Sequence, residues 1–178
     1  MSLGALTATF SPPASCTESF GHAYLLGTQF APTYYGPATT DGCFPRNYIA
    51  ARDAYYSPGV CPAAYTSACS STNVIGSLTE TAITCCPTGF DCNTQLEFSW
   101  ETTLLCSSSY ALTTTQTIPV TFLGTRGSIV RISTDTAATA GGMNAFGYQV
   151  RFQSTDFQPV SLCFLLSAVA DQQTDCFL

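Results

Sequence analysis

The chain has 178 residues and a formal net charge of −6 at pH 7, and 46% of its residues are hydrophobic while only 9% are charged. This length suggests one domain that buries a core of its own. The five basic residues are arginines scattered along the chain. Phosphate binding needs a clustered positive surface, so nucleic acid is excluded as a partner.

Ten cysteines dominate the chemistry of the sequence. Their number is even, and no Cys-x-x-Cys pair suggests a zinc site or a thioredoxin-type redox centre. With His22 as the single histidine, a mixed Cys/His zinc site lacks ligands at suitable spacing. We therefore predict disulfides, an oxidising extracellular setting, no metal and no cofactor. The predicted half-cystines are Cys16, Cys43, Cys61, Cys69, Cys85, Cys86, Cys92, Cys106, Cys163 and Cys176, and their pairing is left open.

The first segment, residues 1–15, is expected to be extended, because Pro12 and Pro13 disfavour helix and remove backbone donors. Its opening residues lack the basic start and the long apolar run of a signal peptide. From Cys16 to Val60 the aromatic residues are separated by glycine and proline, which predicts long loops. One short helix is possible over residues 45–55.

Two tyrosine doublets in these loops are candidate ligand contacts. Amphipathic aromatic rings on loops can form a platform on which sugar rings stack. The alternative interpretation places the rings in the core or uses them to anchor the loops. The candidate ligand-binding residues are Tyr34, Tyr35, Tyr55 and Tyr56, with Trp100 as a further ring.

The run from Cys61 to Cys106 contains six of the ten cysteines, including the adjacent pair Cys85 and Cys86. Neighbouring cysteines cannot easily bond each other. In a strand their side chains point to opposite faces, so the pair is predicted to connect one strand to layers on both sides. Two cysteine-rich turns flank residues 74–83, which are rich in β-branched side chains and are predicted to form a strand.

Alternation of apolar and polar residues predicts further strands over residues 95–102 and 146–153. Residues 118–123 and 128–133 are predicted to form a hairpin with a four-residue loop, and residues 134–142 a loop. The side chains expected to point inward are Leu96, Phe98, Trp100, Phe146, Tyr148, Val150 and Phe152. Short strands with little helical periodicity predict an all-β, disulfide-rich antiparallel sandwich or barrel with long loops.

Catalytic motifs are not found in the sequence. His22 is the sole candidate for a histidine base, and no Gly-x-Ser-x-Gly elbow occurs. Glu97 and Glu101 fall on one face of the predicted strand at 95–102, but four residues of strand separate their positions by about 13 Å. That separation is too long for a glycosidase pair. No catalytic residue is predicted, and a non-enzymatic protein is favoured.

Four phrases of the sequence stand out together: Leu3–Cys16, Tyr55–Pro62, Thr84–Cys92 and Asn144–Asp156. They resemble a family of uncharacterised cysteine-rich cell-surface proteins of filamentous fungi (ascomycetes). The resemblance covers residues 1–158. It implies an ectodomain that is usually followed by one transmembrane helix, and it supplies no activity or catalytic residues.

This chain departs from the family pattern after Asp156. Residues 159–178 form a divergent tail, in which the apolar run Val160–Ala170 is about half as long as a membrane-spanning helix. The anchor expected from the family is therefore absent. Two explanations remain open: a genuine end in which Cys163 pairs with Cys176, or an altered reading of the gene.

The sequence thus favours a non-enzymatic extracellular or cell-surface domain that binds or senses at the fungal cell wall or host interface. A cell-wall glycan or a host protein is the expected partner. The alternative is a secreted enzyme or carbohydrate-binding module that acts on polysaccharide. Two carboxyl groups about 5–10 Å apart in one cleft would favour the enzyme, whereas a shallow aromatic groove without them would favour binding.

Overall fold

A computed structural model describes residues 1–16, 20–25, 32–40, 42–94, 97–124 and 128–157. Strands make up most of its regular structure, together with two short 3₁₀ helices. The strands are β1 (Phe20–Leu25), β2 (Thr33–Tyr35), β3 (Tyr65–Ile75), β4 (Leu78–Pro87), β5 (Asp91–Cys92), β6 (Cys106–Ala111), β7 (Thr117–Leu123), β8 (Ile129–Thr136), β9 (Ala140–Ala145) and β10 (Tyr148–Gln153), and the 3₁₀ helices are η1 (Ala14–Cys16) and η2 (Ser99–Thr102).

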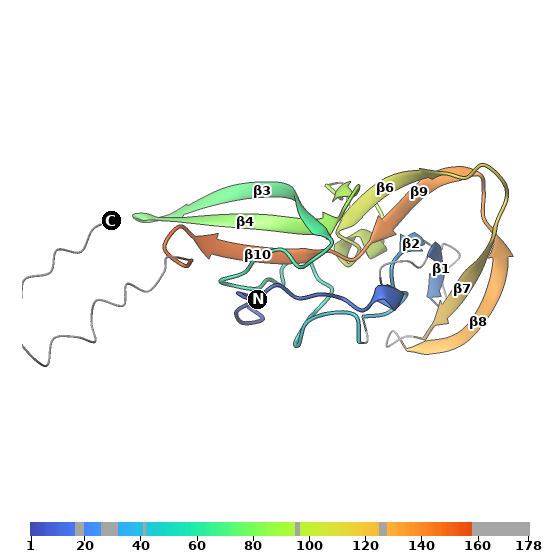
Figure 1. The fold of residues 1–178 in the computed structure, drawn as a ribbon, viewed down its shortest axis with the longest axis horizontal. Helices are drawn as coiled ribbons and strands as arrows, with labels where there is room; N and C mark the ends of the chain where they lie inside the picture. Colours follow the sequence, from blue (N-terminus) through green and yellow to red (C-terminus); the bar gives the residue numbers. More distant parts are fainter. Residues whose placement is uncertain (17–19, 26–31, 41, 95–96, 125–127, 158–178) are drawn as a thin grey trace, which may run out of the picture.

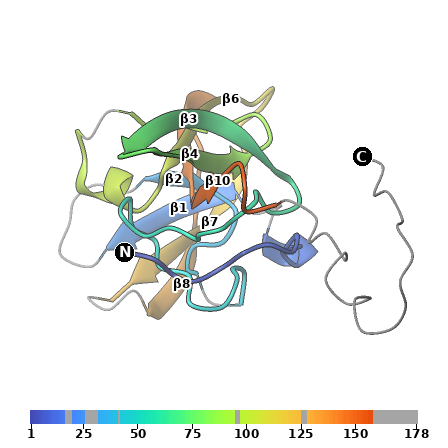
Figure 2. The same ribbon diagram turned by 90° about the vertical axis from the view of Figure 1, so that its left-hand side faces the viewer.

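The strands form two sheets that meet in the middle of an elongated molecule (Figure 1). One sheet has the order β5-β6-β9-β2-β1-β7-β8, and the other has the order β10-β4-β3. Figure 2 looks along the long axis from the β3–β4 end, with the seven-stranded sheet behind. The predicted all-β, disulfide-rich class is confirmed. The pairing is mixed, because β1 with β7 and β2 with β9 are parallel, and neither sheet closes into a barrel over the described residues.

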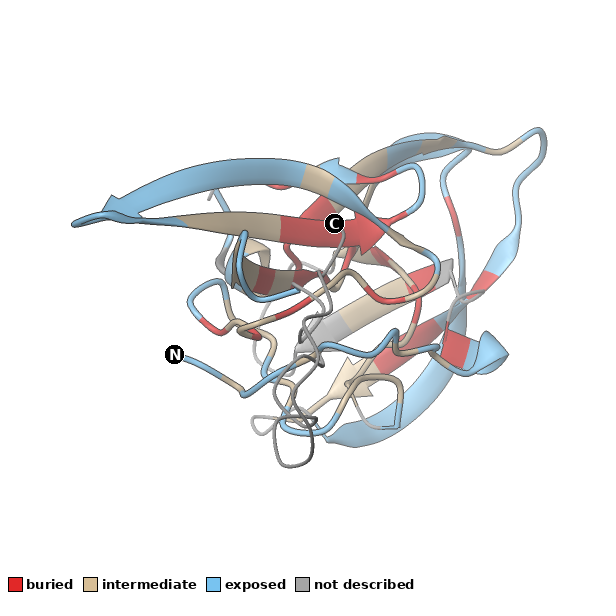
Figure 3. Ribbon diagram, turned by 60° about the vertical axis from the view of Figure 1, so that its left-hand side comes forward, coloured by how far each residue is buried: buried red, intermediate tan, exposed pale blue. Residues whose placement is uncertain are grey.

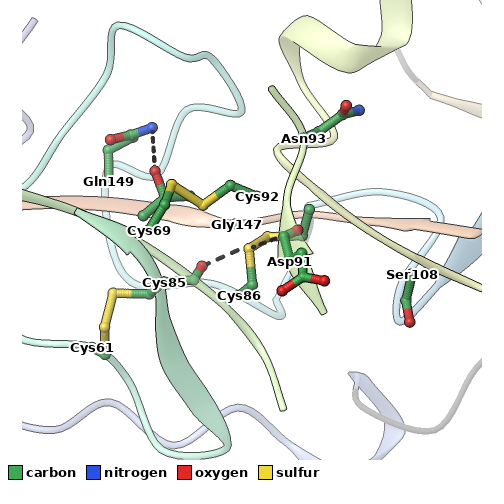
Figure 4. Close-up of a disulfide and its surroundings, with 12 residues drawn as sticks. Cys61, Cys69, Cys85, Cys86, Asp91, Cys92, Asn93, Ser108, Gly147 and Gln149 are labelled. Carbon is green, nitrogen blue, oxygen red and sulfur yellow. Dashed lines mark hydrogen bonds between the residues drawn. A yellow bond between two sulfur atoms is a disulfide. The ribbon is translucent and has the colours of Figure 1, made fainter. Parts of the chain in front are cut away.

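The cysteine pair at the end of β4 connects two cores, as predicted. Cys85 bonds Cys61, and Cys86 bonds Cys106. Cys85 packs with Tyr56, Tyr148 and Val150, whereas Cys86 packs with Phe90, Leu105 and Ala145. Figure 3 shows buried residues gathered where the sheets meet, and Figure 4 shows the Cys61–Cys85 bridge leaving β4 on the side away from Cys86. Because neighbouring side chains of a strand point to opposite faces, one disulfide lies in each core.

Two other disulfides, Cys16–Cys43 and Cys69–Cys92, tie the aromatic loops and β3 to the rest of the molecule. The chain passes between the sheets at Gly147, where a Cβ would lie 2.7 Å from the Cys106 sulfur. Only glycine fits such a close approach.

The amino-terminal segment is extended, as predicted. Its backbone bonds residues 55–59, with Leu3 N–H donating to the Tyr55 carbonyl and Leu6 N–H donating to the Pro58 carbonyl. Residues 55–59 in turn line the edge of β10, because Tyr56 and Val150 form a parallel bridge. The short helix considered for residues 45–55 is wrong. Turns occupy this segment, and Asn47 has a φ of +65°, which ends any helix.

The single strand predicted at residues 74–83 is wrong in its boundaries. These residues instead span the tip of the β3–β4 hairpin, whose last pair is Ile75 with Leu78. Gly76 at the turn has a φ of +64°, a conformation that glycine adopts at little cost. A two-residue Gly-Ser turn is typical of a β-hairpin. The β-branched residues on both sides of it favoured one continuous strand in the sequence-based prediction.

The strand predicted over residues 95–102 is wrong. Residues 95–96, including Leu96, lie outside the described residues, and η2 follows at Ser99–Thr102. The Glu101 carboxylate accepts a hydrogen bond from the Phe98 N–H, a capping contact that favours the helical turn. Phe98 is 45% exposed, and its ring stacks on Trp100 with centroids 4.5 Å apart. The two rings therefore pack on each other instead of entering the core.

The hairpin predicted from residues 118–123 and 128–133 is confirmed as β7 and β8, with Ile118 and Val120 buried. The loop predicted over 134–142 is shorter, because β8 continues to Thr136 and β9 begins at Ala140. The strand at 146–153 is confirmed as β10 from Tyr148. Tyr148 and Val150 are buried, whereas Phe146 and Phe152 are half-buried at its two ends.

The tail from residue 159, with Cys163, Cys176 and their possible pairing, lies outside the described residues. In the part of the chain that is described, no helix is long and apolar enough to cross a membrane.

Candidate functional site

A hollow of about 290 Å³ opens where the two sheets meet. We call it the Tyr35–Tyr65 groove after its two aromatic rings. It is lined by Cys16, Tyr35, Gly36, Ala64, Tyr65, Pro87 and Thr88. Its volume lies at the small end of ligand sites in proteins, which suits a single sugar ring or a single side chain.

The first wall comes from the end of β2 and from η1. Tyr35 is half-buried, and its ring packs on Phe90 with centroids 5.4 Å apart. Gly36 has a φ of +93°, and a Cβ there would lie 3.1 Å from the Cys16 carbonyl oxygen. The absence of a side chain at this position therefore lets the chain pass close to the Cys16 carbonyl group.

The second wall comes from the beginning of β3 and the end of β4. Ala64 has a φ of +64°, a left-handed conformation that costs a non-glycine residue about 1–2 kcal/mol. Thr88 holds it there, since its N–H and its hydroxyl both donate to the Ala64 carbonyl oxygen, at 3.2 and 3.4 Å. Backbone strain that the surrounding structure maintains tends to occur at functional positions.

Tyr65 joins the groove to the core beneath it. Its ring meets Tyr148 edge to face, with centroids 4.7 Å apart. Burial raises the pKa of Tyr65 to about 12. Tyr65 therefore presents an apolar ring to the groove, while its hydroxyl interacts with Tyr148 in the core.

Disulfides hold every segment that lines the groove. Cys16 is bonded to Cys43, and the Ala64–Tyr65 segment lies between the half-cystines Cys61 and Cys69. Pro87 and Thr88 follow Cys86 directly. Walls fixed in this way lose little conformational entropy when a ligand binds.

Each tyrosine doublet has one ring inside the protein and one ring at its surface. Tyr34 is buried and its hydroxyl lies 3.4 Å from the Thr121 hydroxyl, while Tyr35 lines the groove. Tyr56 is also buried, with its hydroxyl donating to the Arg46 carbonyl. Tyr55 lies beneath the Arg151 guanidinium, 3.9 Å from ring centroid to Cζ. Ligand contact by these residues stays a prediction, and Tyr35 is the one of the four that lines the Tyr35–Tyr65 groove.

The groove brings no acid or base together, since none of its lining residues carries a carboxylate or an imidazole. Glu97 precedes η2, and Glu101 lies within it, where its carboxylate accepts the Phe98 N–H. His22 lies in β1, paired with Thr33 and Val120. No cluster of three or more potential metal ligands occurs among the described residues.

Sequence reasoning missed most of the groove. Tyr65 was visible within the Cys61–Cys69 phrase, but nothing in the sequence placed it beside Tyr35, thirty positions earlier. The positive φ of Ala64 has no signal in a residue type that normally avoids it. A hollow made by two sheets depends on tertiary contacts that periodicity does not encode.

Comparisons with models of known protein families, with curated proteins and with solved structures found no match. The assignment of function therefore depends on the geometry of the groove and on the motifs of the sequence.

Proposed function

We propose that this protein is a non-enzymatic cell-surface domain of a fungus that binds a cell-wall glycan in the Tyr35–Tyr65 groove. Its disulfides and all-β fold are those of an extracellular domain. The fungal assignment draws on the similarity of the cysteine phrases and of residues 144–156 to fungal cell-surface proteins.

The observation that carries the proposal is the composition of the groove. Two tyrosine rings face a hollow with strained, disulfide-fixed walls and with no carboxylate on its lining. Glycoside hydrolysis usually needs two carboxyl groups on either side of the bond. The groove therefore supports holding a sugar and not cleaving it.

Carbohydrate suits this hollow better than a charged ligand does. The apolar faces of sugar rings pack on tyrosine rings, while their hydroxyls need donors and acceptors at the rim. Tyr65 supplies an apolar ring, and Thr88 and the backbone supply polar groups. No arginine lines the groove, so nothing there would select a phosphate or a carboxylate.

The test is a pull-down of the purified protein on insoluble fungal cell-wall polysaccharides, with the supernatant assayed for released sugar. We expect retention on at least one polysaccharide fraction without an increase in reducing ends. Release of sugar would show an enzyme, the alternative assignment. Retention on a parallel set of immobilised host extracellular proteins, with none on polysaccharide, would replace the glycan by a protein partner.

A further inference from the structure

The strand β8 forms one end of the seven-stranded sheet (Figure 1). All of its residues are exposed. Three of its aliphatic side chains face solvent: Ile129 is 50% exposed, Val130 58% and Ile132 65%. A long open edge with exposed aliphatic residues is a template for pairing with another strand, and monomeric proteins usually protect such edges.

The other sheet edges of the described structure differ from β8. The edge at β5 is two residues long, and the edge at β10 is lined by residues 55–59. The edge at β3 is regular over residues 69–75, after a register shift between Ser67 and Cys69, but it carries no charged residue that could set the register of a second strand. In β8 the register shifts only at its beginning, beside Phe122 and Leu123, which leaves residues 131–136 regular.

The ladder between β7 and β8 shows which backbone groups of β8 face outward. Pro119 has no N–H, and it lies opposite Thr134, while Ala137 N–H donates to the Gln116 carbonyl. In an antiparallel ladder the hydrogen-bonded pairs alternate. Odd-numbered residues of β8 therefore bond β7, and Ile132 and Thr134 direct their N–H and C=O groups away from the sheet. The Thr136 N–H also points outward and donates to one oxygen of the Asp135 carboxylate, at 2.7 Å.

The two charged residues of β8 have opposite signs and lie symmetrically about Ser133. Arg131 and Asp135 are on the same face, but four residues of strand separate them by about 13 Å, so they cannot pair within one chain. The Arg131 guanidinium stacks on the Phe122 ring with Cζ 4.0 Å from the centroid. Stacking uses the face of the guanidinium and leaves its in-plane N–H donors able to bind a carboxylate.

We propose that two copies of this chain associate through an antiparallel β8–β8 pairing whose twofold axis passes at Ser133. In this register Arg131 lies opposite the partner's Asp135, and Asp135 lies opposite the partner's Arg131. Ile132 lies opposite the partner's Thr134, and the outward N–H and C=O groups of these residues bond across the axis.

In this register opposite charges face each other on one side of the paired strands, and apolar side chains meet on the other side. The charged residues occupy non-hydrogen-bonded positions, where facing side chains come closest. On the opposite face, the isoleucines at position 132 of both copies become diagonal neighbours and cover each other. The two seven-stranded sheets would then continue as one sheet across the axis. An isologous contact of this kind closes at two copies and does not propagate.

The experiment is analytical ultracentrifugation of the full chain over a range of concentrations, with charge-reversal variants. The wild type is expected to shift from the monomer mass of 18.8 kDa towards twice that mass. Arg131→Asp places aspartates opposite each other, and Asp135→Arg places arginines opposite each other. Each variant alone should dissociate roughly tenfold or more readily than the wild type, because like charges oppose pairing.

A mixture of the two variants is the decisive experiment. The two aspartates of one variant then face the two arginines of the other, so opposite charges are restored at both pairs. We expect the equimolar mixture of Arg131→Asp and Asp135→Arg to form a heterodimer with near wild-type affinity, while circular dichroism shows both variants folded. Three results would overturn the proposal: a wild type that stays monomeric at every concentration, a dimer that neither reversal weakens, or a mixture that fails to associate.

Discussion

Two adjacent tyrosines serve different purposes in each doublet, because neighbours in an extended segment point to opposite sides. Tyr34 and Tyr56 enter the core, and Tyr35 and Tyr55 remain at the surface. A doublet therefore cannot act as a flat platform of two rings. Ligand contact by the doublets stays a prediction, and the sequence did not say which ring of each pair is accessible.

Alanine at neighbouring positions of the first doublet should separate stability from binding. Tyr34→Ala removes a buried ring and should lower the free energy of unfolding by about 3–5 kcal/mol. Tyr35→Ala loses one ring contact with Phe90 and should cost about 1 kcal/mol. Urea unfolding of the two variants provides the comparison. Equal losses would mean that Tyr35 is a core residue and not a groove wall.

Buried tyrosines also predict how stability changes at alkaline pH. Burial raises the pKa of Tyr56 and of Tyr65 to about 12, above the value of about 10 in an unfolded chain. The folded state thus retains protons that the unfolded state releases, so the free energy of unfolding is unaffected below pH 10 and falls as the pH rises from 10 towards 12. Absorbance titration of tyrosinate, run beside circular dichroism, should show a late group that ionises with unfolding. Ionisation of all tyrosines near pH 10 in a folded protein would contradict these environments.

At the scale of elements, the end of β4 holds the structure together through two disulfides that leave it in opposite directions. The cross-links Cys86–Cys106 and Cys69–Cys92 close loops of similar length, with separations of 20 and 23 residues. They differ in burial, since Cys86 and Cys106 are fully buried while Cys69 is exposed. They therefore form a matched pair for experiment.

Replacing both cysteines by alanine should destabilise the protein in both cases, but unequally. The change in loop entropy is about 3 kcal/mol for either bridge. Loss of Cys86–Cys106 adds a cavity in the core and should bring its cost to roughly 4–5 kcal/mol. Chemical unfolding of the two double variants measures the difference. A larger loss of unfolding free energy on removal of Cys69–Cys92 would contradict this expectation and would show that the cross-link to β3 contributes more to stability.

Strand prediction succeeded where alternation reflects burial and failed where it does not. Ile118 and Val120 are buried in β7 and Tyr148 and Val150 in β10, and both strands were predicted with nearly correct bounds. Residues 95–102 show the same alternation, but Phe98 and Trp100 stack on each other at the surface and Glu101 caps a 3₁₀ turn. Local contacts between side chains therefore override the alternation that predicts a strand. The alternation in residues 95–102 resembles that of β10, so the pattern does not distinguish the two outcomes.

At the scale of the whole molecule, the groove exists because the two sheets meet end to end. Its walls come from residues 16, 35–36, 64–65 and 87–88, which no local pattern connects. The disulfide Cys16–Cys43 ties the first wall in place. The fold class and the extracellular character could be predicted from cysteine content and strand patterns, whereas the groove could not.

Removing this disulfide should affect binding more than folding. The double change Cys16→Ser with Cys43→Ser frees the loop that carries Tyr35 and Gly36, so the bound state would have to order it. We expect roughly tenfold weaker retention on the polysaccharide fraction that binds the wild type, with the strands intact by circular dichroism. Unchanged retention would show that the first wall takes no part in binding.

The most direct measurement is a binding isotherm on cell-wall polysaccharide for the wild type, Tyr35→Ala and Phe98→Ala. Phe98 provides the control, because it is an exposed aromatic residue outside the groove. We predict that Tyr35→Ala weakens binding at least tenfold, which corresponds to the loss of one stacked ring, and that Phe98→Ala matches the wild type. Full binding by Tyr35→Ala, or loss of binding in Phe98→Ala, would contradict the assignment of the groove.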